Sequence, residues 1–422
     1  MSGQQAVAGR TGPRAVPVVL VGLTLVVLSV SADLAWVLVP WTEAPAGPVD
    51  PDAGLAPAAV ADARAVAASL RLPGLLSLAA AVLTAALIVL TGPGRRLLAQ
   101  ARRVRGGVVV QVVAQLLLVL GVVLLVRWPF GMWAERLRRE AGLSVQDWGG
   151  WARDRLVGAG LEAVVLVVVV LAVVLLARWL PRWWPAVAAG TGAALVVVVS
   201  LLHPVLVEPA LSELGPLPAG PVREQVEQVA VQAGAPVADV LVSQESTRTT
   251  TLNAYVSGLG PTRRLVLQDT LLAALPPEQL LGVVAHETAH AAARDVARGT
   301  VLGAVGVASL VLVLGTAAQA VTVGRGRSGR VGTAGAAGAV LLVVLLVQVL
   351  GAPAESLVSR QVERAADVRA VELTQDPQAY AEAMRTLLVT NRSDPSPPAL
   401  HQWWFGTHPS GAERVARAEA GG

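Results

Sequence analysis

Long apolar stretches, separated by short polar loops, fill the first half of the chain and return between residues 300 and 350. A bilayer core is about 30 Å thick, so a helix that crosses it needs about 20 apolar residues. Seven stretches are long enough, and Arg and Trp lie near their ends, as at Arg127 and Trp128. We therefore expect seven spans, at 17–39, 73–92, 106–128, 157–177, 184–207, 299–323 and 333–352.

Two polar regions remain, 208–298 and 353–422, and each has the composition of a soluble protein. Each is too short for a core of its own, so we expect the two to pack together. The chain then divides into an N-terminal membrane domain of five spans, 1–207, and a second domain, 208–422. The last two spans, at about 299–323 and 333–352, interrupt the second domain.

Shorter patterns predict the elements of this second domain. A helix is expected over 221–233, with Gly234 just past its end. The segments 240–243 and 265–268 are typical of short strands, and the extended stretch 253–258 lies between them. Further helices are expected from Pro277 through His290, over 355–373 and over 378–389. The fold class is therefore mainly α, a polytopic membrane protein with a small β-sheet.

Composition supports a membrane protein. Hydrophobic residues make up 54% of the 422 residues and charged residues 15%, against about 45–50% and about 25% in soluble domains. This excludes a disordered chain and an ordinary soluble enzyme. The net charge of +4 comes from arginines, since lysine is absent, and their places near membrane ends indicate no nucleic-acid partner. The residue usage is typical of a GC-rich genome, so we expect a multi-pass protein of a bacterial cell membrane.

The candidate chemistry rests on few residues. Cysteine is absent, which excludes disulfides, thiolate metal sites and a cysteine nucleophile. Among five histidines, His286 and His290 stand four apart within an expected helix, so both rings lie on one face. Two imidazoles one turn apart can bind one zinc ion, and Glu287 beside them can act as general base. The alternative is a helix with two incidental histidines.

A catalytic zinc ion needs a third protein ligand. No histidine follows at the spacing of some zinc proteases, because Arg294 and Asp295 occupy that stretch. In the helix expected after the seventh span, Glu363 and Asp367 are four apart and share a face. One of them can bind zinc, and we expect Glu363 to do so, while the other accepts the free N–H of a ligand histidine. The alternative is a surface helix carrying Glu–Arg pairs.

These motifs resemble the type I CAAX prenyl protease family, integral-membrane zinc metallopeptidases of the gluzincin type. The resemblance rests on the His-Glu-x-x-His and Glu-x-x-x-Asp motifs above and on the number of spans. It extends to the segments 252–258 and 264–272, to Thr407 to Ser410 with Glu413 and Arg414, and more weakly to 129–154. It departs at 208–212, where the family's usual Pro-x-Phe-Asn is absent, and at Asp295, where eukaryotic members often carry His.

The resemblance implies a split metalloprotease domain that holds one Zn2+ per chain through His286, His290 and Glu363. It implies that His408 donates a hydrogen bond to the oxyanion or the substrate carbonyl. It also implies that Arg414, with Asp367, orients the ligands from behind. Asn253 and Ala254 would lie on an edge strand that pairs with the substrate backbone. Each of these roles has a plainer alternative. His408 could be a loop histidine, Arg414 a surface arginine, and the segment with Asn253 and Ala254 an ordinary hairpin strand.

The expected function is a membrane zinc metalloendopeptidase whose partners are a peptide or protein substrate, possibly membrane-associated, and the lipid bilayer. One alternative is a quality-control protease of the heat-shock type, which usually has fewer spans. A zinc-binding transporter or receptor would need more ionisable residues in its spans than Glu162 and His203, and an inactive scaffold would not need Glu287.

Membrane orientation has two conflicting signals. Arginines at 95–105, 178–182 and 325–330 mark one face as cytoplasmic by the positive-inside rule, which places the zinc motif on the other face. Six arginines between 127 and 155 blur that signal. The resemblance implies a cytoplasmic catalytic site, and on the sequence alone we favour that side.

Overall fold

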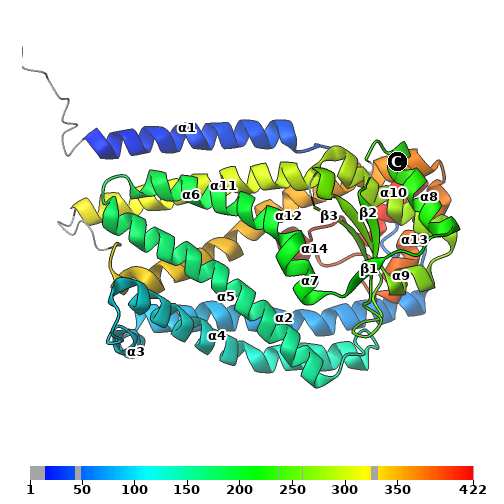
Figure 1. Cartoon of the computed structure of the whole chain (residues 1–422). Coiled ribbons are helices and arrows are strands. Elements are labelled where there is room, and N and C mark those ends of the chain that lie inside the picture. Colours follow the sequence, from blue (N-terminus) through cyan, green and yellow to red (C-terminus); the bar gives the residue numbers. More distant parts are fainter. Residues whose placement is uncertain (1–14, 43–48, 236, 259, 325–330, 422) are drawn as a thin grey trace, which may run out of the picture.

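The computed structural model describes residues 15–42, 49–235, 237–258, 260–324 and 331–421. Within them, seven helices are long and apolar enough to cross a membrane, as expected. They lie alongside one another in a bundle, with the small sheet and most of the short helices at one end (Figure 1). They are α1 (Ala15–Leu38), α2 (Pro57–Leu90), α4 (Gly107–Glu140), α5 (Trp148–Trp179), α6 (Trp184–Leu202), α11 (Asp295–Gly324) and α12 (Ala337–Thr374).

Several of these helices extend beyond the apolar stretches that predicted them. α2 begins at Pro57, well before the expected start at residue 73, and α4 continues to Glu140. α6 ends at Leu202, earlier than expected, and a π-helical turn (His203–Val207) and α7 (Glu208–Leu211) follow it. Apolar periodicity detects the part of a helix that lies in the bilayer, so it misses polar turns that emerge from it.

The expected break between the seventh span and the following helix is absent. α12 is one helix of 38 residues that runs straight through Pro353. Proline lacks the N–H that would bond the carbonyl four residues earlier, at Val349. The indole Nε1 of Trp404 donates to that carbonyl instead, at 3.1 Å. Because the Trp404 side chain satisfies the freed carbonyl, the membrane span and the segment that carries Glu363 form one continuous helix.

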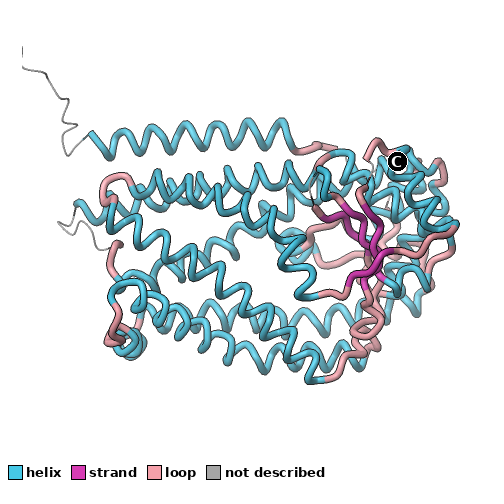
Figure 2. The backbone as a smooth tube through the Cα atoms, in the orientation of Figure 1, coloured by secondary structure: helices cyan, strands magenta, loops and turns pink. Residues whose placement is uncertain are grey.

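Four short strands form one mixed sheet at one end of the bundle (Figure 2). They are β1 (Leu214–Pro216), β2 (Asp239–Ser243), β3 (Ala254–Ser257) and β4 (Arg264–Gln268), in the order β1-β2-β4-β3. β2 and β4 are parallel, whereas β1 and β3 are antiparallel to their neighbours. The sequence pattern predicted every strand except β1, and β3 lies at an edge.

The two polar regions share one hydrophobic core, as their sizes suggested. Val240 and Val284 from the first region, and Tyr380 and Val415 from the second, belong to the same buried cluster. The helices around this core are α8 (Pro221–Gln232), α9 (Asp269–Ala274), α10 (Pro277–Ala293), the last turns of α12, α13 (Pro377–Thr390) and α15 (Gly411–Glu419). The short helix α14 (Ala399–Phe405) packs against α12. Shared burial brings α10 and α12 side by side, although the whole of α11 separates them in sequence.

Candidate metal centre

Two histidines of α10 face each other at the centre of the site. α10 starts with proline at its first position and ends where Arg294 adopts a left-handed conformation, with φ of 58°. His286 and His290 lie one turn apart, and their Nε2 atoms are 3.2 Å from each other. His286 is buried, whereas His290 is partly exposed. The helix therefore presents two imidazole nitrogens to one point.

Glu363 of α12 completes a triangle of ligand atoms. Its Oε2 lies 3.3 Å from Nε2 of His286, and its Oε1 lies 3.6 Å from Nε2 of His290. Tetrahedral zinc with ligands at 2.0–2.1 Å requires ligand atoms about 3.4 Å from one another. The three distances fit that requirement. His2Glu is also a ligand set that zinc proteases use, with the fourth position left open.

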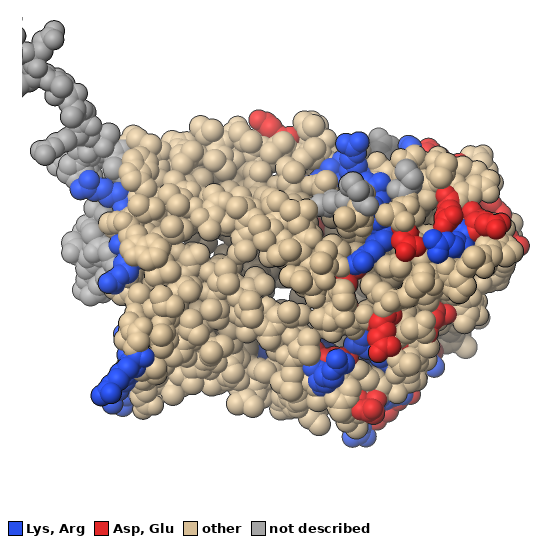
Figure 3. Space-filling view, viewed as in Figure 1, with Lys and Arg blue, Asp and Glu red and all other residues tan. Residues whose placement is uncertain are grey.

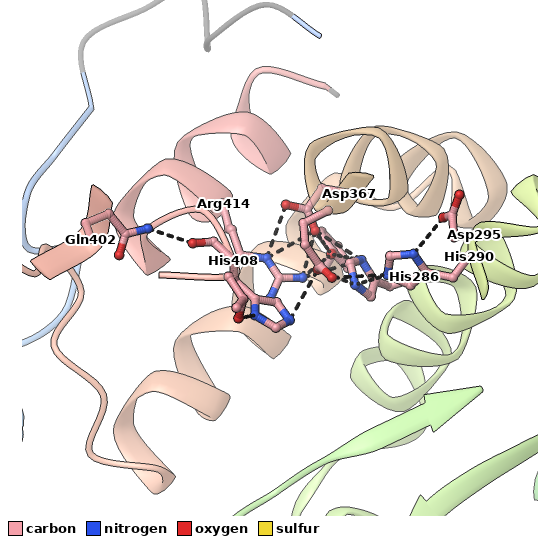
Figure 4. A network of polar contacts seen from close by, with 10 residues as sticks. His286, His290, Asp295, Asp367, Gln402, His408 and Arg414 are labelled. Atoms are coloured by element: carbon pink, nitrogen blue, oxygen red, sulfur yellow. Dashed lines mark hydrogen bonds and ion pairs between the residues drawn. The ribbon is translucent and has the colours of Figure 1, made fainter. Parts of the chain in front are cut away.

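The outer nitrogens of both rings are held by carboxylates. His290 Nδ1 lies 2.9 Å from Asp295 Oδ2, and His286 Nδ1 lies 3.1 Å from Asp367 Oδ1 (Figure 4). A carboxylate there favours the tautomer with hydrogen on Nδ1, which leaves the Nε2 lone pair free for a metal. Two such lone pairs 3.2 Å apart repel each other unless a cation lies between them. This arrangement fits a divalent metal.

The electrostatics of the buried ring lead to the same conclusion. Burial lowers the pKa of His286, but the carboxylates of Asp367 and Glu363 outweigh it and raise the pKa to about 9. The surroundings of this ring therefore favour a positive charge, which a metal ion would supply.

Behind His286 lies a buried polar network that only the structure reveals in full. Asp367 accepts hydrogen bonds from Arg414 Nη2 at 2.7 Å and from the hydroxyl of Tyr380 at 2.6 Å. That hydroxyl also lies 3.1 Å from His286 Nδ1. Burial raises the pKa of Tyr380 well above its ordinary value, so it remains a neutral hydroxyl. The network connects α10, α12, α13 and α15 and fixes the orientation of the His286 ring.

Glu287 lies beside His286 but contributes none of the three ligand atoms. Within the described residues, its carboxylate forms no hydrogen bond or ion pair. Burial raises its pKa above the usual value for glutamate. A carboxylate that binds protons more readily, with no fixed partner, can accept a proton from a nearby donor.

His408 approaches the same triangle from the loop between α14 and α15. Its Nε2 lies 3.4 Å from Glu363 Oε2, and 56% of its side chain is exposed. Nδ1 lies 3.0 Å from the Thr407 hydroxyl, and the backbone carbonyl of His408 accepts from Gln402 Nε2 at 2.6 Å. Partial burial beside the other groups of the site lowers the pKa of His408, which favours the neutral ring. A neutral imidazole can donate one hydrogen bond into the space next to Glu363.

The expected substrate strand lies where an added strand could reach it. Ala254 begins β3, which pairs with β4 on one side only, and β3 packs against α10. Asn253 immediately precedes β3, is exposed, and accepts from the Gln268 N–H at 3.1 Å. Ala254 therefore lies on an edge strand, as the resemblance implied, and Asn253 lies just before that strand.

Three functional candidates were not predicted as such. Asp295 carried a usable signal, because it follows His290 by five residues, just past the helix end, and can fold back onto the ring. No sequence pattern marked Tyr380 or Arg360 as functional. Arg360, one turn before Glu363 on α12, is buried and donates to the carbonyls of Gln402 and Gly406, at 2.9 and 2.7 Å. It therefore fixes the loop that carries His408.

Comparison with known proteins places these features in a family context. Residues 216–421 match the model for peptidase family M48, and residues 67–213 match the model described as CAAX prenyl protease N-terminal, five membrane helices. The chain is 27% identical over 305 residues to an uncharacterized metalloprotease, YhfN, of Bacillus subtilis (strain 168), which covers 70% of each chain. It is 32% identical over 216 residues to a protease HtpX homolog of Kineococcus radiotolerans, covering 46% of this chain and 71% of that one.

Other matches are shorter in sequence or rest on structure. A CAAX prenyl protease 1 homolog of Oryza sativa is 35% identical over 98 residues, so the match spans only 23% of that protein's length. The crystal structure of Ste24p from S. mikatae superimposes with a TM-score of 0.73 at 18% identity. It covers 98% of this chain and 100% of that one. The whole fold, membrane helices included, is therefore shared with a solved structure.

Proposed function

This chain belongs to peptidase family M48 and is a multi-pass membrane metallopeptidase, and we propose that it binds one zinc ion and cleaves extended peptide segments of membrane-associated proteins. The observation that carries the proposal is the triangle of His286, His290 and Glu363 atoms, with Glu287 free beside it. Zinc, when bound, activates water and polarises the scissile carbonyl.

In the proposed mechanism each residue has one task. Glu287 takes a proton from the attacking water and delivers it to the leaving amine, which its raised pKa favours. His408 donates a hydrogen bond from Nε2 to the oxygen of the scissile carbonyl as negative charge develops there. Asp367 and Arg414 hold the His286 ring in place. Asp295 does the same for His290.

Substrate selection would begin with the backbone. An extended peptide that adds to the free edge of β3, beside Asn253 and Ala254, would gain main-chain hydrogen bonds without strict sequence requirements. The N-terminal match favours processing of the CAAX type over quality-control cleavage, since it includes the membrane helices described for CAAX prenyl proteases. We propose that the substrate is a lipid-anchored or membrane-bound protein. The experiment below determines whether it is prenylated.

The test compares Glu287→Gln with Glu278→Gln, which changes the same residue type in the first turn of α10, away from the site. Purified full-length chains are assayed for cleavage of a casein-derived peptide mixture by mass spectrometry, and for zinc content. Loss of a general base typically costs about 10²–10⁴-fold in rate. We expect that loss in Glu287→Gln with zinc retained, and wild-type behaviour in Glu278→Gln.

Cleavage by Glu287→Gln at the wild-type rate would contradict the mechanism. Proteomics of cells that carry the same variant identifies the substrates, because uncut proteins accumulate. Accumulation of proteins with prenylated C-termini would support CAAX processing, whereas accumulation of misfolded membrane proteins would favour quality control.

A further inference from the structure

The free edge of β3 offers backbone groups to an added strand at few positions. On the paired side, Asn253 accepts a hydrogen bond from the Gln268 N–H at 3.1 Å, so these two residues form a hydrogen-bonded pair of the antiparallel ladder. Hydrogen-bonded and non-hydrogen-bonded positions alternate along such a ladder. Ala254 and Val256 are non-hydrogen-bonded positions, and their N–H and C=O groups therefore point away from β4, toward the free edge.

The preceding position of the same kind, Leu252, is already occupied. The side-chain amide of Asn391 accepts from the Leu252 N–H at 2.7 Å and donates to the Leu252 carbonyl at 3.1 Å. One side chain thus forms both of the bonds that a neighbouring strand would form at that position. Among the described residues, no side chain forms such bonds to the backbone of Ala254 or Val256. The open part of the edge therefore begins after Leu252.

The loop that carries Asn391 is fixed by the N-terminal membrane domain. Charged side chains of both signs gather at the end of the molecule with the sheet (Figure 3), and ion pairs join the two domains. Arg392, next to Asn391, donates to both carboxylate oxygens of Asp62 on α2, at 2.9 and 2.7 Å. Asp394 is paired with Arg71, also on α2, at 2.6 Å. Asn391 itself has an ordinary φ of −82°, which other residues adopt without strain.

The segment that leads into β3 is held by the same domain. The hydroxyls of Thr249 and Thr250 donate to the carbonyls of Leu143 and Gly142, both at 2.8 Å, in the turn between α4 and α5. The side chain of Leu252 is buried in the core of the second domain. Because this segment cannot slide without breaking these contacts, the position at which Asn391 meets the edge is fixed.

We propose that Asn391 is a specificity-determining residue, whose side-chain amide ends the free edge at Leu252, so that an added peptide strand pairs with Ala254 and Val256 only. This inference rests on the proposed function, in which the added strand is the substrate. The two open carbonyls accept N–H groups from two peptide residues that stand two apart, in whichever direction the peptide runs. The edge therefore takes a short extended segment and rejects proline, which has no N–H, at those two places.

Peptide binding without cleavage tests how far the open edge extends. The full chain with Glu287→Gln is used, because this substitution leaves the three ligand residues in place. The peptide that it retains most strongly from the casein-derived mixture is synthesised with a fluorescent label, and its Kd is measured by anisotropy. A series of this peptide then carries one N-methyl group at each backbone nitrogen in turn. Loss of one hydrogen bond should weaken binding about 2- to 10-fold.

The outcome is the number of sensitive nitrogens, meaning those at which methylation weakens binding. With Asn391 present we expect two, two residues apart. Asn391→Ala and Asn391→Ser free the N–H and carbonyl of Leu252, so a third should appear, two residues beyond one of the first pair. Thr250→Val is the matched control, because it loses a bond of the same segment but keeps Asn391. It should retain two sensitive nitrogens.

Three results would overturn the inference: two sensitive nitrogens in both Asn391 variants, three with Asn391 present, or no peptide retained at all. A residue that only stabilised the fold would give the first of these results, with a lower thermal midpoint. Failure of the proposed function looks different. If the unsubstituted chain does not cleave a peptide that binds with two sensitive nitrogens, the peptidase mechanism is wrong, whereas the role of Asn391 at the edge stands.

Discussion

The two ends of this molecule differ in how their charged side chains are buried and paired. At the metal centre, the charged groups of the His286 network are buried or partly buried and have partners in the chain, as Asp367 has in Arg414 and Tyr380. At the other end, seven arginines are exposed and have no acidic partner among the described residues: Arg95, Arg96, Arg102, Arg103, Arg105, Arg178 and Arg182. The first arrangement holds atoms at fixed distances for chemistry, whereas the arginines of the second are not held by any ion pair within the described residues. Substitutions should therefore have large effects at one end and small effects on stability at the other.

The largest expected effect on folding comes from Arg414→Ala. It leaves the buried carboxylate of Asp367 with the Tyr380 hydroxyl and the His286 ring as partners but without its arginine, and breaking such a buried ion pair costs about 3–5 kcal/mol. The control is Arg95→Ala on α3 (Gly92–Ala101), at the other end of the bundle, where the side chain is exposed and forms no ion pair with the described residues. Thermal unfolding in detergent should show a much lower midpoint for Arg414→Ala and almost no change for Arg95→Ala. Similar midpoints for the two variants would remove the contrast between the ends.

A smaller effect is expected at the second ligand histidine. Asp295→Asn keeps the shape of the side chain but weakens its hold on His290 Nδ1. Loss of such an outer partner typically lowers metal affinity about 10–100-fold. Competition with a zinc chelator measures this directly, without any substrate. Unchanged affinity would mean that His290 is positioned by its helix alone.

The smallest effect concerns a carboxylate next to the sheet. Burial raises the pKa of Asp269, but hydrogen bonds from the Ser246 hydroxyl and from the N–H groups of Ser246, Glu245 and Thr270 outweigh it and lower the pKa. A lowered pKa means that the stabilisation is complete above the unfolded value of 3.8 and is lost as pH falls through the folded value. Asp269→Asn should cost about 1 kcal/mol at neutral pH.

The unfolding free energy of Asp269→Asn should also depend less on pH in the acid range than that of the wild type. Unfolding free energies measured at pH 7 and pH 3 check this. If the substitution lowered the unfolding free energy equally at both pH values, the charge of Asp269 would not contribute to stability.

The sequence predicted what repeats along the chain or stands at fixed spacing. Apolar stretches indicated the seven spans, and the four-residue spacings brought His286 and His290, and Glu363 and Asp367, onto common helix faces. Beyond the meeting of Glu363 and Asp367 with the two histidines, it predicted few contacts between elements far apart in sequence. Tyr380 reaches His286 across 94 positions, and no local pattern marks it. The seventh span and the helix over 355–373 were expected as separate elements, because nothing in the sequence showed that Trp404 would bond the carbonyl freed by Pro353.

The central claim is that His286, His290 and Glu363 form a zinc site, and the zinc content of purified full-length chains tests it most directly. His286→Ala is compared with His401→Ala, a histidine of α14 that packs on Phe405 and lies outside the ligand triangle. The account predicts one zinc ion per chain in the wild type and in His401→Ala, and almost none in His286→Ala. A full zinc ion in His286→Ala, or none in the wild type, would contradict it.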